Sequence, residues 1–179
     1  MAVTIGMGDY VYQYQPGWAR LPSEMAFQTP SAVAVDSQDR VYVFQRHGPP
    51  VLVFDSGGGF LMAWPRRDGE LEDAHHIYIG PDDGVYLADR DAHQVLKFTT
   101  EGELVMALGH RHKPALQAPF NHPSDIAVAP SGEIYVSDGY GNSRVHKYSP
   151  DGKLLFSWGG PGTDPGEFNI VHNIVTDKN

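Results

Sequence analysis

The sequence predicts an all-β fold built from four-stranded β-propeller blades. Residues 121–159 contain four short runs rich in β-branched and aromatic side chains, separated by turns rich in Gly, Pro, Asn and Asp. This pattern is typical of antiparallel strands joined by hairpins. The same pattern occurs twice upstream, and a further copy begins at Phe168. The copies recur at intervals of about 44 to 49 residues, which is the length of one propeller blade. Their first strands open at Pro30, Ala74, Pro123 and Val171.

The whole chain is expected to be a partial propeller with about three and a half of six blades, because six blades of this length need about 280 residues. An alternating run at its start is expected to complete the last blade of a closed ring, where it would hide sheet edges. The chain is therefore expected to be the N-terminal part of a longer protein, or two copies associate to bury the open faces. The expected parts are the closing strand at 10–14, blades at 30–64, 73–109 and 121–159, and the first strand of the next blade at 168–179.

Composition narrows the function classes. With 22 acidic and 13 basic residues the formal charge is −9, which disfavours a nucleic-acid-binding surface. The absence of cysteine excludes a disulfide framework and fits a reducing compartment. Residues 1–9 lack the features of a signal peptide, and no apolar run is long enough to span a membrane. We therefore expect a cytoplasmic protein without membrane contact, while secretion stays open if the N-terminus is incomplete.

Histidine recurs at one position of alternate repeats. The residue after each opening position is Ser31, His75, Ser124 or His172. First strands of propeller blades line the central channel, so we expect His75 and His172 to converge on its axis, with a third histidine from the sixth blade beyond Asn179. Three histidines with an open fourth position form a catalytic zinc site. The alternative is that two of the nine histidines share this phase by chance and bond locally.

Other polar residues in the repeats have simpler interpretations. His76 is out of phase with the histidine recurrence. Asp89 and Asp138 follow the second strands of two repeats, where a short acid bonds the backbone N–H groups of a turn. Among the other histidines, we expect five to be exposed on outer strands or loops, namely His93, His110, His112, His122 and His146.

Tyr140 and Arg46 are the candidate catalytic residues. Tyr140 lies in a glycine-flanked turn after a second strand, where packing does not need a large aromatic side chain. A tyrosine base must lose a proton with a pKa of about 10, which costs about 4 kcal/mol at neutral pH, and nearby zinc and an arginine would supply this free energy. Arg46 ends the corresponding strand of the first repeat on the same rim. Its alternative interpretation is a solvated loop arginine.

The repeats resemble NHL repeats. The runs VSDGYGNSRVHKYSPDGKLLFSWG and PGEFNIVH are similar to the catalytic core of the peptidyl-α-hydroxyglycine α-amidating lyases. The resemblance covers residues from about 30 to the end, and DGYGNSR is its most specific motif. It implies a six-bladed propeller whose axial zinc is held by three histidines and which cleaves carbinolamide substrates, small molecules or peptides, into an amide and glyoxylate.

The resemblance also assigns roles to individual residues. His75 and His172 match two zinc ligands, Tyr140 matches the catalytic tyrosine, and Arg46, in the run VFQRH, matches the active-site arginine. The family also has a structural calcium ion. It is bound partly by backbone carbonyls that correspond to Val33 and Ile77.

The chain departs from the family at several positions. The third histidine, a calcium-binding aspartate and a second arginine would lie beyond Asn179. Asn121 and Gly141 stand where the animal enzymes have a disulfide, and Ala74 and Val171 replace a proline that precedes the zinc ligands in the family. Two other functions therefore remain open: a non-enzymatic NHL scaffold that binds a peptide or protein, and a hydrolase in which zinc-bound hydroxide attacks an ester or lactone.

Overall fold

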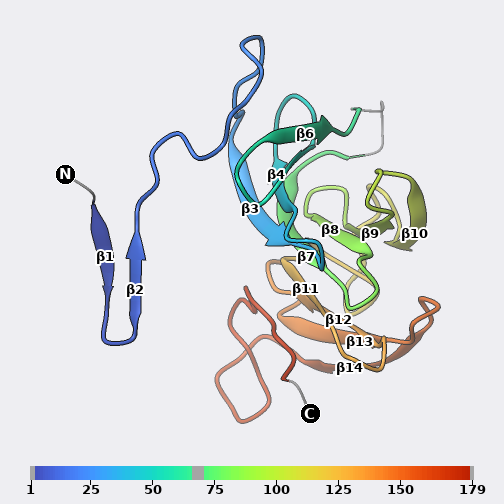
Figure 1. Cartoon of the computed structure of the whole chain (residues 1–179). Helices are drawn as coiled ribbons and strands as arrows, with labels where there is room; N and C mark the ends of the chain where they lie inside the picture. Colours follow the sequence, from blue (N-terminus) through green and yellow to red (C-terminus); the bar gives the residue numbers. More distant parts are fainter. Residues whose placement is uncertain (1–2, 66–70, 178–179) are drawn as a thin grey trace.

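The computed structural model describes residues 3–65 and 71–177, and these residues form an all-β structure (Figure 1). Three sheets have four antiparallel strands each, and a fourth sheet has two. Within the described ranges no helix is present, and so none that is long and apolar enough to cross a membrane. The predicted fold class is confirmed.

Each four-stranded sheet is one propeller blade whose strands follow the chain order. The first blade consists of β3 (Pro30–Val35), β4 (Val41–Gln45), β5 (Val51–Phe54) and β6 (Phe60–Ala63). The second consists of β7 (Ala74–Ile79), β8 (Val85–Asp89), β9 (Gln94–Phe98) and β10 (Leu104–Gly109). The third consists of β11 (Asp125–Val128), β12 (Ile134–Asp138), β13 (Arg144–Tyr148) and β14 (Leu154–Gly159).

The first strands of the blades are neighbours in space. β7 contacts β3 on one side and β11 on the other, so the inner strands of the three blades lie side by side, as Figure 1 shows. Tight turns join the strands within each blade. Gly152, for example, has a φ of 84° in the turn between β13 and β14, a conformation that glycine adopts without steric cost.

Two hydrophobic cores join the blades face to face. The core between the first and second blades includes Tyr42, Phe44, Leu87 and Phe98, all at most 1% exposed. The core between the second and third blades includes Phe120, Ile126, Ile134 and Val136, all fully buried. Because both faces of the middle blade are covered, the three sheets form one packed unit.

The two outermost sheet faces remain partly open. On the first blade, a third cluster places Trp18 to Met25 over Leu52 and Phe54, yet Val33 and Val35 on β3 are 63% and 53% exposed. On the third blade, Phe156 is 54% exposed and packs against Trp158. We call these two surfaces the open faces.

The N-terminal segment forms a hairpin that extends from the blades (Figure 1). β2 (Tyr10–Gln13) pairs with β1 (Thr4–Met7), and all eight residues of the two strands are exposed. Among the described residues β2 has no pairing with a blade. Its expected role as a closing strand stays a prediction.

The segment after the third blade does not form the strand expected at 168–179. No strand is assigned over 169–177, and residues 178–179 lie outside the described ranges. The segment instead contacts β11: the Ile174 N–H donates to Asp125 Oδ2 (3.0 Å), and the Thr176 hydroxyl donates to the Val128 carbonyl (3.4 Å). A strand needs backbone-to-backbone ladder hydrogen bonds with a paired neighbour, whereas each of these contacts to β11 has a side-chain group as one partner.

Candidate active site

Three of the predicted site residues meet at the inner end of the blades. The Tyr140 hydroxyl lies 3.0 Å from His75 Nε2 and 2.8 Å from His172 Nε2, and the centres of the two imidazole rings are 5.1 Å apart. His75 belongs to β7, Tyr140 to the loop after β12, and His172 to the segment after β14. His76 points elsewhere, to Asp125 Oδ1 at 2.9 Å. The alternating histidines therefore share one hydroxyl partner.

A backbone carbonyl fixes the tautomer of His75. Its Nδ1 lies 2.6 Å from the Ser124 carbonyl oxygen, which can only accept, so Nδ1 carries the proton. Burial lowers the pKa of His75, partly opposed by this hydrogen bond, and the nearby Arg90 guanidinium lowers it further. The imidazole is therefore neutral, with a lone pair on Nε2 that faces Tyr140.

His172 has the same arrangement. Its Nδ1 lies 3.3 Å from Asn173 Oδ1, and the amide of Asn173 is oriented because its Nδ2 donates to Asp125 Oδ2 at 3.4 Å. Nδ1 of His172 is thus the donor, and Nε2 again carries a lone pair. Two lone pairs face a hydroxyl that has a single proton. Neutral imidazoles whose other nitrogen is held by a carbonyl oxygen are the usual protein ligands of zinc.

A catalytic zinc site needs three protein ligands, and among the described residues two predicted ligands, His75 and His172, lie close together. No group of three or more His, Cys, Asp or Glu side chains within 3–65 and 71–177 has the geometry of a metal site. The predicted calcium ligands, the carbonyls of Val33 and Ile77, belong to the neighbouring inner strands β3 and β7. Nothing in the described chain tests them further, and calcium binding stays a prediction.

A buried network holds the loop that carries Tyr140. Asp138, fully buried, accepts hydrogen bonds from the Asn121 N–H (2.9 Å) and from Asn142 Nδ2, and lies 3.1 Å from His146 Nε2. These contacts confirm the structural role expected for Asp138. Asp89 likewise accepts from the N–H groups of Glu72 and Asp73, both at 2.8 Å.

Close backbone packing ties the Tyr140 loop to the histidine segment. A Cβ atom on Gly139 would lie 1.9 Å from the Val171 carbonyl oxygen, so only glycine allows the loop to approach the residue before His172. Gly141 donates its N–H to the Asn121 carbonyl at 2.9 Å. The two positions that carry a disulfide in the animal enzymes are therefore neighbours here, joined by a hydrogen bond.

The expectation of exposed outer histidines is wrong for two of them. His146 is fully buried, between Asp138 and the Ser157 hydroxyl, 2.7 Å from its Nδ1. His93 is 6% exposed, and its Nδ1 accepts the His122 N–H at 3.1 Å. Both imidazoles find hydrogen-bond partners inside the protein, and a buried polar side chain is stable when it has such partners.

The site also contains an arginine that sequence reasoning missed. The guanidinium carbon of Arg90 lies 5.7 Å from the centre of the Tyr140 ring. Arg46, the predicted arginine, places its Nε 3.2 Å from Asp73 Oδ1 and 3.3 Å from the Ala74 carbonyl, next to His75. Both arginines directly follow the second strands of their blades. This shared position was the signal available in the sequence.

Comparisons with known proteins show what the chain is similar to. The NHL repeat model matches residues 120–148. The human NHL repeat-containing protein 3 is 34% identical over 94% of this chain and 52% of its own length. The Drosophila melanogaster peptidyl-alpha-hydroxyglycine alpha-amidating lyase 1 is 38% identical over 48% of this chain and 16% of its own length. The chain thus spans about half the length of the human relative.

A structural comparison supports the architecture. The virginiamycin B lyase from Staphylococcus aureus has a TM-score of 0.57 and 19% identity, covering 73% of this chain and 41% of that chain. At this identity the likeness shows the fold alone. Together with the NHL repeat and the relatives, it shows that the chain is an NHL-repeat β-propeller domain that resembles peptidyl-α-hydroxyglycine α-amidating lyase.

Proposed function

We propose that the protein is a zinc-dependent lyase that cleaves a carbinolamide substrate to an amide and glyoxylate. The observation that carries the proposal is the Tyr140 hydroxyl held between His75 Nε2 and His172 Nε2. His75 and His172 would hold the metal together with one further ligand. A bound zinc supplies Lewis acidity toward the substrate hydroxyl.

Tyr140 is placed to move the proton in this reaction. Its phenol oxygen would accept the proton of the substrate hydroxyl. The O–H electron pair then forms the carbonyl of glyoxylate, the carbon–nitrogen bond breaks, and the leaving amide nitrogen takes up a proton. The Arg90 guanidinium lies over the ring of this tyrosine, 5.7 Å from its centre. Arg46 keeps its predicted role of positioning the carboxylate end of the substrate or steadying the tyrosinate.

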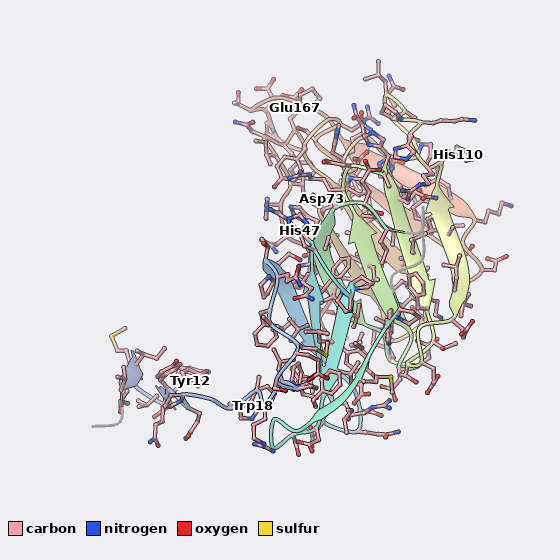
Figure 2. All side chains as sticks on the ribbon, turned by 90° about the horizontal axis from the view of Figure 1, so that it is seen from above. Tyr12, Trp18, His47, Asp73, His110 and Glu167 are labelled. Carbon is pink, nitrogen blue, oxygen red and sulfur yellow. The ribbon has the colours of Figure 1, made fainter. Side chains whose placement is uncertain are left out.

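Turnover of an N-acyl-α-hydroxyglycine, followed by glyoxylate release, tests the proposal. We expect Tyr140→Phe to lower kcat by about a hundredfold or more, the usual contribution of a positioned acid or base, while zinc content stays unchanged. Tyr12→Phe is the matched control, because Tyr12 lies on the exposed β1–β2 hairpin, away from Asp73 in Figure 2. Unchanged activity in Tyr140→Phe, or a purified protein without zinc, would refute the proposal.

A second candidate is a non-enzymatic scaffold whose rim binds a peptide or protein. It is favoured by the extent of the similarity to the human NHL repeat-containing protein 3, which covers nearly the whole chain. The double variant His75→Ala with His172→Ala separates the two functions. A lyase loses turnover and zinc, whereas a scaffold keeps its affinity for its partner.

A further inference from the structure

Arg90 is held next to the histidine and tyrosine cluster by two carboxylates. Its Nε lies 2.8 Å from Asp91 Oδ1 and its Nη2 lies 3.3 Å from Asp91 Oδ2. The same Nη2 lies 3.0 Å from Asp73 Oδ2. Because these contacts fix one edge of the planar guanidinium, its position over the Tyr140 ring is set by the protein itself.

The Nη1 end of this guanidinium has N–H donors that the two carboxylates do not use. An arginine carries five N–H donors, and the carboxylate contacts engage those of Nε and Nη2. Within the described part of the chain, the hydrogen bonds of the Arg90 side chain come from Nε and Nη2, and none comes from Nη1. The side chain is 28% exposed, so a ligand can reach part of this arginine from solvent.

The surrounding charges leave room for an anion. Asp73 is shared: its Oδ1 pairs with Arg46 and its Oδ2 with Arg90, so one carboxylate holds two guanidinium groups. Asp91 is 44% exposed, and water screens its charge. A ligand carboxylate that approaches Nη1 therefore meets a permanently charged, oriented donor pair.

We propose that Arg90 is a substrate-binding residue that takes the carboxylate of the ligand through Nη1. This inference rests on the proposed function, since it names a residue that selects anionic substrates at the same site. An α-hydroxyglycine carries its hydroxyl and its carboxylate on neighbouring carbons. Its hydroxyl at Tyr140 would therefore bring its carboxylate within reach of the adjacent guanidinium.

Binding of two unreactive probes tests this assignment. N-benzoylglycine carries the carboxylate and N-benzoylglycinamide lacks it, so calorimetry on both measures the preference for the anion without requiring turnover. We expect Arg90→Gln to weaken N-benzoylglycine binding by about tenfold or more, the usual effect of losing a charged hydrogen bond, and to leave N-benzoylglycinamide binding unchanged. Arg90→Lys keeps the charge and should retain part of the preference.

Arg20→Gln is the control for the loss of one positive charge. Its Nη1 bonds the Gly57 carbonyl, and it follows Trp18, which lies at the end of the blades far from Asp73 in Figure 2. Equal loss of both probes in Arg90→Gln, unchanged binding of both, or no binding by the unaltered protein would overturn the proposal. If N-benzoylglycine binding depends on Arg90 but no hydroxyglycine is turned over, the proposed lyase function is refuted and the proposed anion site is retained.

Discussion

Asp138 determines where the Tyr140 loop sits. It is fully buried and serves as the common partner of Asn121, Asn142 and His146. Asp138→Ala leaves those groups buried without their acceptor, and each such group costs about 1–3 kcal/mol. We expect the variant to lose about 3 kcal/mol of unfolding free energy in urea titrations, whereas the exposed Asp164→Ala should match the unaltered protein. A loss no larger than that of the control would show that the network does not hold the loop.

The repeat phase was enough to find some site residues and not others. His75 and His172 share one position in their repeats, and Tyr140 stands out because its turn does not need an aromatic side chain for packing. Arg90 was missed because its place in the site depends on a neighbouring blade, and only the packing of the two blades brings it over the Tyr140 ring. The burial of His146 was missed because its partner Asp138 lies on the adjacent strand of the same blade, and the repeat phase does not show that contact.

The turn between β3 and β4 is built around one acid. Asp36 accepts hydrogen bonds from the N–H groups of Gln38 and Arg40, both at 2.9 Å, from Arg40 Nε at 2.6 Å and from the Tyr42 hydroxyl at 3.0 Å. Burial alone would raise the pKa of Asp36, but these hydrogen bonds outweigh it and lower the pKa below its ordinary value of 3.8. The folded state therefore favours the ionised carboxylate.

This shift gives the turn a defined pH dependence. A lowered pKa stabilises the fold above the unfolded value of 3.8, and the contribution disappears as the pH falls through the lower folded value. Asp36→Asn should therefore be less stable than the unaltered protein at neutral pH, by about 1–3 kcal/mol, with the gap closing in acid. Urea midpoints measured from neutral pH to below 3.8 check this. Asp39→Asn, in the same turn, is the control, and a gap that persists in acid would contradict the assignment.

At the scale of the molecule, the strand pattern predicted the repeating sheets but not their outer surroundings. Hairpin turns and alternating side chains are local features, so the three blades follow from the sequence. The cover that residues 18–25 place over Leu52 and Phe54 is a contact between distant segments and carries no local signal. For the hairpin of β1 and β2, the sequence predicted a strand at 10–14 but not its pairing with β1.

The open faces make self-association of this chain the expected behaviour. Each face is the surface that an adjoining blade would cover, and one carries Val33 and Val35 while the other carries Phe156 and Trp158. Water contact with such patches is unfavourable, and apolar faces that fit each other drive association.

Sedimentation velocity should show the 179-residue chain associating as its concentration rises. Phe156→Lys should shift it toward the monomer, because burying a lysine charge at a contact is costly. Leu104→Lys makes the same exchange on an exposed site of the middle blade, whose faces are already packed, and should leave association intact. A monomer at every concentration, or equal effects of the two lysines, would show that the open faces do not mediate contacts between copies.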